Sequence, residues 1–329
     1  MKNIFFLIFF IPFTLYSQDK QNPLSKDFFL MFYNVENLFD TIDNPKTNDN
    51  TFLPSSKKKY NTYKYNHKLS QLAKVFLSIK QNNNGKLPDI IGLCEVENKL
   101  VIDDLLKQAV FNDHDYTIIH KDSPDSRGID CALLVNNRFK LIKKDYISVL
   151  NPDSKRSTRD IVFAKLNYNN DVFNLFVNHW PSRWGGQSES NHKRVYAAKV
   201  LKRYIEQNTN DNEYTLVMGD FNDHPDNESV KDVLVADDFI NLMDTDLSTG
   251  LGSYNYKGDW NWLDQIIFSK NFVDNCFKVL SGGSFYEKYM LYENKNGVMY
   301  PSRSFGGDKY YGGFSDHLPI YCKISFICK

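Results

Sequence analysis

Residues 217–225 read Val-Met-Gly-Asp-Phe-Asn-Asp-His-Pro, and residues 314–319 read Phe-Ser-Asp-His-Leu-Pro. In each stretch, polar side chains adjoin an apolar run that has the length and composition of a strand. The first stretch contributes an acid and an amide, and the second contributes an acid and an imidazole: Asp220, Asn222, Asp316 and His317. A base, a metal ligand and hydrogen-bond donors on such turns are the groups that metal-assisted hydrolysis of a phosphate ester requires.

Apolar runs of strand length recur along the whole chain. They occupy residues 28–34, 89–96, 115–119, 129–135, 161–167, 171–178, 214–219, 263–268, 275–280 and 318–327. Between them, apolar residues at helical spacing within 69–79 and 197–205 predict two amphipathic helices. One sheet of about ten strands would twist too far to stay open, so we expect two packed sheets with helices on the outer faces. The predicted fold class is α/β, more narrowly α+β, arranged as a four-layer α/β/β/α sandwich of two mixed sheets.

The first residues have the composition of a secretory signal peptide. Lys2 is followed by an apolar run over residues 4–16 and then by Ser17, a small residue at the expected cleavage point. This run of about 13 residues is shorter than the ~20 that an ordinary transmembrane helix needs, so a retained membrane anchor is the less favoured alternative. We therefore expect residues 1–17 to be removed on export to the periplasm or the extracellular space. Residues 18–329 are expected to form a single domain that acts as a monomer.

Charge and cysteine content limit the classes of protein to which this chain could belong. Lys and Arg total 40, as do Asp and Glu, so the chain lacks the positive excess of tight nucleic-acid binders. Five cysteines leave at least one unpaired. Cys94 and Cys131 lie within apolar strand-like runs and Cys322 alternates with core residues, which predicts buried positions for all three. The sequence leaves open whether Cys276 bonds to Cys322 or to Cys328.

Polar side chains stand at the ends of six predicted strands. Among them is Glu95, which follows the apolar residues 90–94, and its carboxylate is costly to bury without a partner. Mg²⁺, which prefers oxygen ligands and retains water, would supply that partner; a surface ion pair is the alternative. Six such strand ends in one chain predict a common rim, which would contain Asn34, Glu36, Asn37, Glu95, Glu97, His179, Ser182, Arg183, Asp220, Asn222, Asp264, Asp316 and His317.

In this order, the motifs resemble those of the endonuclease/exonuclease/phosphatase superfamily, whose members share the fold of DNase I. They are Tyr-Asn-Val-Glu (33–36), Ile-Gly-Leu-Cys-Glu (91–95), Arg-Gly-Ile-Asp (127–130), Asn-His-Trp (178–180), Gly-Asp-Phe-Asn (219–222), Trp-Leu-Asp (262–264) and Ser-Asp-His (315–317). The similarity extends over nearly all of the chain beyond the signal peptide. More narrowly, Asn-Val-Glu-Asn-Leu-Phe-Asp (34–40) and Asn-His-Trp-Pro-Ser-Arg (178–183) are similar to secreted endonuclease-like members from Bacteroidetes.

The resemblance implies a Mg²⁺ cofactor, with Mn²⁺ as a substitute. Glu95 would be the principal ligand, helped by Asn34 and Asp316 directly or through water. Glu36 is an extra acid that either joins the metal site or balances a nearby arginine. Arg127, Arg159 and Arg183 are candidates for binding the substrate phosphate. The alternative for Arg127 and Arg159 is a structural carboxylate partner, and the alternative for Arg183 is a surface cation on the ring of Trp184.

The resemblance also implies catalytic roles. Asp220, aligned by Asn222, would orient or deprotonate the attacking water. Asp264 would hold His317 in one tautomer and favour its protonated form, so that an imidazolium meets the phosphate oxygens. His179 and Asn222 would donate hydrogen bonds to the same oxygens. Whether Asp220 or His317 is the base stays open at this point.

The leading hypothesis is an exported Mg²⁺-dependent phosphodiesterase, an endonuclease that hydrolyses DNA or RNA by in-line attack of water. Lysines and tyrosines in 57–65 and aromatics in 282–313 would bind the strand, unless these loops pack on their own aromatics. One alternative is a sphingomyelinase-like phospholipase that inserts Phe285, Tyr286, Tyr289 and Tyr292 into lipid. Another is a small-molecule phosphatase, although inositol phosphatases usually have an arginine where Gln265 stands. A noncatalytic phosphate-binding module is disfavoured, because a binder needs no water-activating carboxylate.

Overall fold

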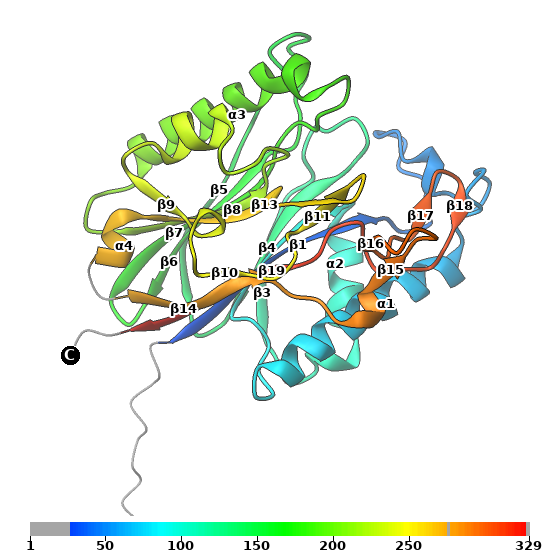
Figure 1. Ribbon diagram of the computed structural model, residues 1–329, viewed down its shortest axis with the longest axis horizontal. Helices are drawn as coiled ribbons and strands as arrows, with labels where there is room; N and C mark the ends of the chain where they lie inside the picture. Colours follow the sequence, from blue (N-terminus) through cyan, green and yellow to red (C-terminus); the bar gives the residue numbers. More distant parts are fainter. Residues whose placement is uncertain (1–26, 275–276, 327–329) are drawn as a thin grey trace, which may run out of the picture.

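Two mixed sheets pack face to face with helices on both outer faces, which confirms the predicted α/β/β/α sandwich (Figure 1). The computed structural model describes residues 27–274 and 277–326. The predicted signal peptide and the candidate bond between Cys276 and Cys328 therefore lie outside the described residues. Within the described ranges, no helix has both the length and the apolar composition needed to cross a membrane.

The predicted strand regions all contain strands. The first sheet has the order β10 (Ser248–Thr249), β14 (Phe277–Ser284), β19 (Ile320–Phe326), β1 (Phe28–Leu38), β2 (Ile90–Val96), β4 (Asp130–Asn136) and β3 (Tyr116–His120). The second has the order β5 (Lys140–Ile147), β6 (Ile161–Tyr168), β7 (Asp171–His179), β8 (Tyr214–Asp220), β13 (Asp264–Ser269) and β9 (Phe239–Asn241). Near the centre of each sheet lies a parallel pair, β1 with β2 and β7 with β8.

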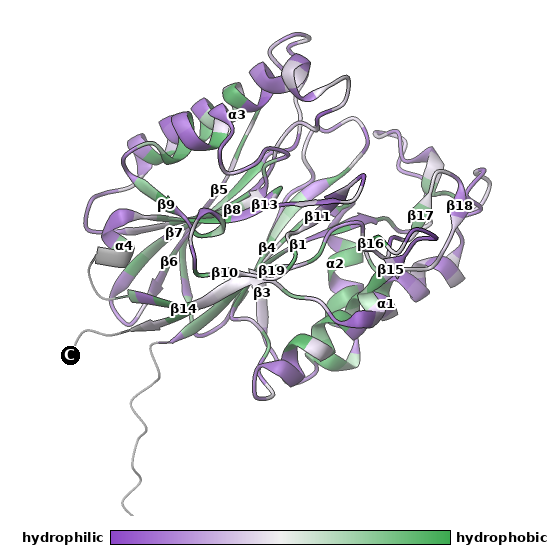
Figure 2. Ribbon diagram, in the orientation of Figure 1, coloured by the Kyte–Doolittle hydropathy of each residue, from purple (hydrophilic) through white to green (hydrophobic). Residues whose placement is uncertain are grey.

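Alternation along β1 explains how the sequence builds these layers. Successive side chains of a strand point to opposite faces of its sheet. Leu30 and Phe32 face the second sheet, where they join Met218 in the central core. Met31, between them, faces outward and packs with Leu72 of the covering helix. Figure 2 shows the hydrophobic residues concentrated on the strands and on the inner faces of the helices.

Three α-helices cover the outer faces of the sheets. α1 (Thr62–Asn82) and α2 (Lys99–Leu106) contribute to the hydrophobic cluster of the first sheet, and α3 (Gln187–Asn208) to that of the second. The side chain of Asn61 caps α1 by accepting a hydrogen bond from the backbone N–H of Lys64. The buried residues of α1 and α3 include most of the two predicted apolar stripes, so both amphipathic helices are confirmed. A fourth helix, α4 (Lys270–Asp274), follows β13 directly.

Several elements of the structure were not expected from the sequence, among them the strand β5 and the helix α2. The strand β5 contains Lys140, Lys143 and Lys144, and this charged composition is not typical of a strand. It forms the edge of the second sheet, where lysines discourage pairing with another chain. The helix α2 has only eight residues and begins directly after the rim residue Glu97, capped by Asn98.

The three predicted buried cysteines are confirmed. Cys94, Cys131 and Cys322 are free and buried, whereas Cys276 lies outside the described residues. Burial raises the pKa of each thiol, because an apolar environment disfavours the thiolate. These three residues therefore act as small core side chains.

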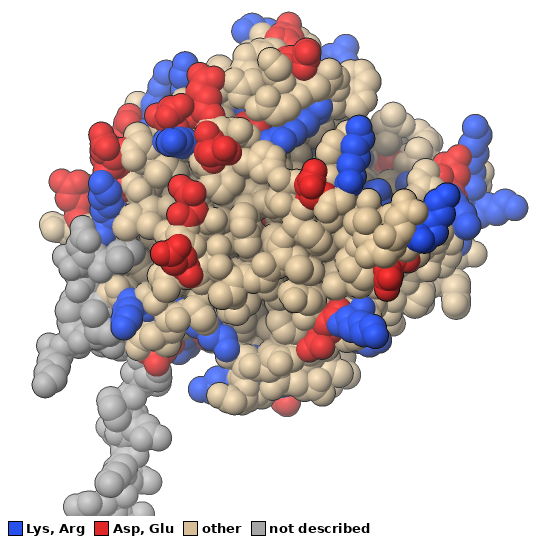
Figure 3. Space-filling model, in the orientation of Figure 1, with Lys and Arg blue, Asp and Glu red and all other residues tan. Residues whose placement is uncertain are grey.

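Short hairpins gather at one end of the sandwich, at the right of Figure 1. They pair β11 (Tyr254–Tyr256) with β12 (Asp259–Asn261), β15 (Leu291–Glu293) with β16 (Met299–Pro301), and β17 (Phe305–Gly306) with β18 (Lys309–Tyr310). The stretch 282–313, which has no clear strand pattern in the sequence, thus consists largely of small hairpins. Basic and acidic side chains are interspersed on the face shown in Figure 3, as the balanced composition predicts.

Candidate active site

Most of the predicted site residues line one cleft of about 620 Å³. Strand ends from both sheets contribute to it, as the six polar strand ends predict. The predicted residues that line the cleft are Glu95, Arg127, His179, Arg183, Asp220, Asn222, Asp316 and His317. Four others, Asn34, Glu36, Arg159 and Asp264, lie behind or beside its walls.

Strand register aligns three of the predicted catalytic side chains. Asp220, the last residue of β8, lies opposite His179 on β7 and opposite Asp264 on β13. The neighbouring Gly219 allows β7 and β8 to approach, since a Cβ there would lie 2.4 Å from the backbone oxygen of Asn178. The positions of these polar groups thus follow from pairing between central strands, which makes the arrangement rigid.

Two donors fix the Asp220 carboxylate. Nδ2 of Asn34 donates to its Oδ2 at 3.0 Å, and the backbone N–H of Asn222 donates to its Oδ1 at 2.9 Å. Burial and the nearby charge of Asp264 nevertheless raise the pKa of Asp220 to about 7, against the opposing effects of His317 and the two donors. A carboxylate with this pKa can accept a proton near neutral pH.

His317 forms a buried pair with Asp264. Nδ1 of His317 donates to Oδ2 of Asp264 at 2.6 Å, which leaves Nε2 directed toward Asp220, 3.9 Å from its Oδ2. Burial by itself lowers the pKa of a histidine, but the carboxylates of Asp264 and Asp220 outweigh it and raise the pKa of His317 well above its ordinary value. The ring of Tyr254 packs against the imidazole, with centroids 4.9 Å apart.

His179 has the opposite electrostatic environment. Its Nε2 lies 3.7 Å from Oδ2 of Asp220 and 3.9 Å from Oε1 of Glu95. Burial, followed by the positive charges of Arg159 and Arg127, lowers its pKa well below the ordinary value, so the ring is neutral. Nδ1 of His179 has no hydrogen-bond partner among the described residues. A neutral imidazole in this position can donate one hydrogen bond into the cleft.

A β-bulge turns Glu95 toward the cleft. The register of β2 shifts between Cys94 and Val96, and Glu95 adopts a left-handed backbone with φ of 62°. Its Oε2 accepts a hydrogen bond of 2.9 Å from the backbone N–H of Asn37. This bond fixes the carboxylate while Oε1 faces the cleft side of the residue, toward His179.

The oxygen atoms at this edge of the cleft fit a hard divalent cation. Glu95 and Asp316 both line the cleft with carboxylates, and the amide oxygen of Asn34, which accepts one bond from the N–H of Glu36, has a second lone pair. Nearby, Asp220, Asp264 and His317 place potential ligand atoms within 4.8 Å of one another. Such a donor set suits Mg²⁺ or Mn²⁺ better than a soft metal.

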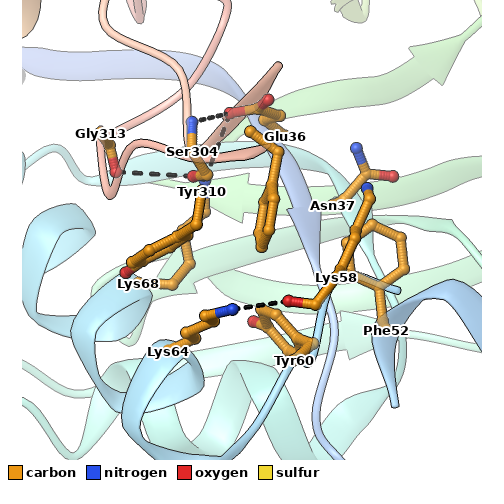
Figure 4. A pocket seen from close by; sticks show the side chains of 11 residues that line it. Glu36, Asn37, Phe52, Lys58, Tyr60, Lys64, Lys68, Ser304, Tyr310 and Gly313 are labelled. Atoms are coloured by element: carbon orange, nitrogen blue, oxygen red, sulfur yellow. Dashed lines mark hydrogen bonds and ion pairs between the residues drawn. The ribbon is translucent and has the colours of Figure 1, made fainter. Parts of the chain in front are cut away.

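Glu36 does not line this cleft. It lies in a separate small pocket, shown in Figure 4. Its Oε1 is 3.3 Å from Nε of Arg303, and its Oε2 accepts a bond of 2.7 Å from the N–H of Ser304 and lies 3.9 Å from Nζ of Lys68. Of the two roles considered for Glu36, the structure therefore favours the balancing of an arginine.

The three predicted phosphate-binding arginines differ in position. Arg127 lines the cleft with a half-exposed side chain. Arg183 also lines it but is committed to the turn after β8, where its Nε donates to the backbone oxygen of Asn222 at 2.7 Å. Arg159 is buried, 3.4 Å from Asp125, and donates to the backbone oxygen of Trp180 at 2.8 Å. Of the three, Arg127 has the most exposed side chain, and its Nε lies 3.7 Å from Oδ1 of Asp125.

Sequence reasoning missed several residues that support the site. Arg303 links Glu36 to Asp316, whose Oδ2 lies 2.7 Å from Nη2 of the arginine. Lys68 is buried in α1 and donates to Ser304. In the sequence, the one indication that Lys68 is buried was its place directly before Leu69, a residue of the predicted apolar stripe. Arg303 and its partner Glu36 are 267 residues apart, and no local pattern connects them.

Comparison with known proteins identifies the family. A buried carboxylate beside a carboxylate-bound histidine, with oxygen ligands for a cation, fits a hydrolase site for phosphate esters. The signature of the Endonuclease/Exonuclease/phosphatase family matches residues 29–325, and the chain belongs to this family. The family assignment and the coarse activity that it implies, hydrolysis of phosphoester bonds with a divalent metal, agree with the prediction. A search of curated proteins returned no match.

Solved structures confirm the DNase I-like fold. TDP2 from D. rerio in complex with single-strand DNA product is 15% identical with a TM-score of 0.58, covering 91% of this chain and 99% of that chain. A mannosyl-6-phosphatase from Bacteroides thetaiotaomicron is 16% identical with a TM-score of 0.58, covering 91% and 100%. An endonuclease/exonuclease/phosphatase family protein from the same bacterium is 16% identical with a TM-score of 0.59, covering 93% and 100%. At these identities the similarity establishes the fold alone.

Proposed function

We propose that this protein is an exported Mg²⁺-dependent phosphodiesterase, and specifically an endonuclease acting on DNA or RNA. The observation that supports this most directly is the buried Asp220, fixed by two donors and aligned with His179, Asp264 and His317. This carboxylate lines the cleft, and its Oδ2 lies 3.9 Å from Nε2 of His317 rather than in a close ion pair with a lysine or arginine.

Asp220 is the general base in this proposal. Its pKa of about 7 lets it take a proton from water as the water oxygen attacks phosphorus in line with the departing ester oxygen. His317 is the less suitable base, because its raised pKa leaves the imidazole already protonated. The assignment therefore favours Asp220 between the two candidates that the sequence left open.

His317 and His179 stabilise the charge that develops on the phosphate oxygens. His317 offers a cationic N–H, and His179 a neutral one. Arg127 adds a half-exposed guanidinium at the same cleft. A cation held by Glu95, Asp316 and Asn34 would polarise the phosphoryl oxygens as a Lewis acid.

A nucleic-acid substrate is favoured over a lipid by the arrangement of the aromatic loop. The lipid hypothesis requires four aromatic side chains in one exposed patch. Instead, Phe285 and Tyr289 pack against the core of the first sheet, and the hydroxyl of Tyr289 lies 2.6 Å from Oγ of Ser78. Only Tyr286 and Tyr292 remain exposed. TDP2 shares the fold and has been observed with a single-strand DNA product, which fits but does not establish the same substrate class here.

The lysines at 57–59 support strand binding only in part. Nζ of Lys58 lies 4.2 Å from the centre of the Phe52 ring and 4.8 Å from that of Phe305, so this side chain packs locally (Figure 4). Lys57 and Lys59 are exposed and available to phosphates. Export and membership of the secreted Bacteroidetes branch remain part of the proposal, supported by residues 1–17 and by the motifs at 34–40 and 178–183.

The test is a parallel assay of plasmid DNA, RNA, sphingomyelin vesicles and inositol phosphates with Mg²⁺. Wild type should cleave a nucleic acid fastest, and Asp220→Asn should reduce turnover by at least ~10²-fold. An Asp259→Asn variant, with an exposed carboxylate on β12, is the matched control. Faster cleavage of vesicles or inositol phosphates than of either nucleic acid would reject the nuclease.

A further inference from the structure

A second cavity of about 300 Å³ adjoins the catalytic cleft. Tyr254 and Asp316 line both cavities. Tyr254 also forms an isolated β-bridge with His317, and its ring packs on that imidazole. The second cavity, called here the tyrosine groove, is therefore directly adjacent to His317.

The tyrosine groove is built by hairpins that are fixed to one another. Nδ2 of Asn255 donates to the backbone oxygen of Met299 at 3.1 Å and so joins β11 to β16. The N–H of Ser302 donates to the oxygen of Met290 at 2.8 Å, and the N–H of Tyr311 donates to the oxygen of Ser304 at 2.9 Å. Backbone bonds at these points make the groove a preformed feature rather than a loose loop, so its shape costs little to order on binding.

Tyrosine rings dominate the walls of the groove. Four of its lining residues are Tyr254, Tyr292, Tyr300 and Tyr311. Tyr292 is 58% exposed and Tyr311 is 59% exposed, so both rings are accessible to a ligand in the groove. The guanidinium of Arg303, on a side chain that is 49% exposed, lies on the same wall and is held by Asp316 and Glu36.

We propose that the tyrosine groove is a subsite for the nucleobase next to the scissile phosphate. This inference rests on the proposed phosphodiesterase function, because the groove shares Tyr254 and Asp316 with the cleft where that reaction would take place. Base faces stack on tyrosine rings and on guanidinium planes without regard to sequence. A base in this groove would position its own phosphodiester beside His317, so the subsite would select nucleotide esters over simple ones.

The chemistry of the walls disfavours two other occupants. An acyl chain requires aliphatic side chains, and apart from Pro301 the groove residues are aromatic, polar, charged or glycine. A sugar requires free carboxylates and amides for its hydroxyls. The amide of Asn255 is already used on both sides, by Met299 and by the N–H of Gly258, and Asp316 is paired with Arg303.

The test compares two esters that share one leaving group. Thymidine 5′-(p-nitrophenyl phosphate) contains a base, whereas methyl p-nitrophenyl phosphate does not. Tyr292→Leu should lower kcat/KM for the thymidine ester about 5- to 100-fold and leave the methyl ester within about two-fold, whereas Tyr292→Phe should retain the preference. Ile142→Ala, which shortens a side chain that is 52% exposed on the edge strand β5, outside both cavities, is the control and should change neither rate.

Each outcome separates this inference from the proposed function. Equal losses on both esters in Tyr292→Leu would overturn the subsite and leave the phosphodiesterase intact. A larger loss on a mannose ester or a long-chain alkyl ester would overturn it in favour of a sugar or lipid site. If wild type cleaves neither ester with Mg²⁺, the proposed function fails. Calorimetric binding of thymidine 5′-monophosphate to wild type and Tyr292→Leu then tests the groove alone, and equal dissociation constants would overturn it.

Discussion

Replacement of Asp264 by asparagine tests whether the cleft uses the charge of His317. Nδ1 of His317 lies 2.6 Å from Oδ2 of Asp264, with side-chain exposures of 7% and 0%. Burial disfavours a charged imidazole, and the pKa of His317 is raised because the Asp264 and Asp220 carboxylates outweigh burial. An asparagine at position 264 keeps the side-chain volume and removes the carboxylate that contributes more to the raised pKa of His317. We therefore expect His317 to become neutral at neutral pH.

The magnitude follows from the role of that charge. Loss of one preorganised donor to a developing oxyanion typically costs about 3 to 4 kcal/mol, which corresponds to a fall in kcat of ~10²- to 10³-fold. His317→Ala should produce a similar loss. Because the two residues act as one unit, the double variant should lose little more than either single variant, rather than the product of the two losses.

Two measurements check this prediction. One is kcat on a simple phosphodiester with Mg²⁺, and the other is the ¹⁵N spectrum of the His317 ring at about pH 7, where an ordinary histidine is mostly neutral. Wild type should show an imidazolium and Asp264→Asn a neutral ring, while Asp259→Asn should match wild type in both. A variant that keeps wild-type kcat, or that keeps the imidazolium, would refute the reasoning.

The same pair gives stability a definite pH dependence. The folded-state pKa of His317 lies above its unfolded value of about 6.5, so its stabilisation is complete below the unfolded pKa and is lost as pH rises through the folded pKa. Asp264→Asn removes this contribution. The difference in unfolding free energy between wild type and variant should therefore be largest near about pH 5.5 and shrink toward alkaline pH. A difference that grows with pH would contradict the assignment.

Three further predictions concern the metal, the fold and the substrate. Glu95→Gln should reduce Mg²⁺-dependent turnover by at least ~10²-fold, because an amide lacks the charge that holds a hard cation. A Mg²⁺ titration of turnover checks this. Full turnover of wild type in excess EDTA would show that the reaction needs no metal. Asp223→Asn should lower the melting temperature by about 5 to 15 °C in calorimetry, because it leaves the fully buried Arg194 without its counterion, which lies 2.7 Å from Nε of the arginine. A decrease in melting temperature smaller than ~2 °C would contradict this. Changing the exposed Lys57 and Lys59 to glutamine should raise KM for DNA and reduce its salt slope by about one unit per lost phosphate contact, and an unchanged slope would exclude them from the binding surface.

The convergence of the site was predictable from strand ends. Asp220 and His179 each end a central apolar strand, and parallel neighbours place their carboxyl ends at the same edge of a sheet. Asp264 starts an antiparallel strand and so meets them at the same edge. Hydrophobic runs specify such strands strongly because both faces are buried, which is why β7, β8 and β13 were expected with nearly correct bounds.

The roles of the charged supporting residues were not predictable, because they depend on long-range partners. Glu36 belongs to the same motif as Asn34, and sequence alone allowed both a metal role and an arginine partner for it. Its pairing with Arg303 and Lys68 depends on how the 282–313 hairpins fold back over α1. Likewise Arg159 and Arg183 resemble phosphate ligands in sequence, but Trp180 and Asn222 occupy their donors with backbone oxygens.

Some rim residues adopt a backbone conformation that no sequence pattern showed, and seven non-glycine residues elsewhere in the described part of the chain also have positive φ. Left-handed backbone occurs at four rim residues that are not glycine, with φ of 48°, 51°, 62° and 51°: Glu36, Asn37, Glu95 and Asn222. Such conformations cost roughly 1 to 2 kcal/mol each for residues with a Cβ. Glycine would remove that cost, yet it would also remove the side chains that line or fix the cleft. Two of these residues donate backbone hydrogen bonds to catalytic-site acids. The backbone N–H of Asn37 donates to the Glu95 carboxylate, and that of Asn222 donates to the Asp220 carboxylate, each at 2.9 Å. The strain therefore orients both acids before substrate binds, which is the preorganisation that electrostatic catalysis requires.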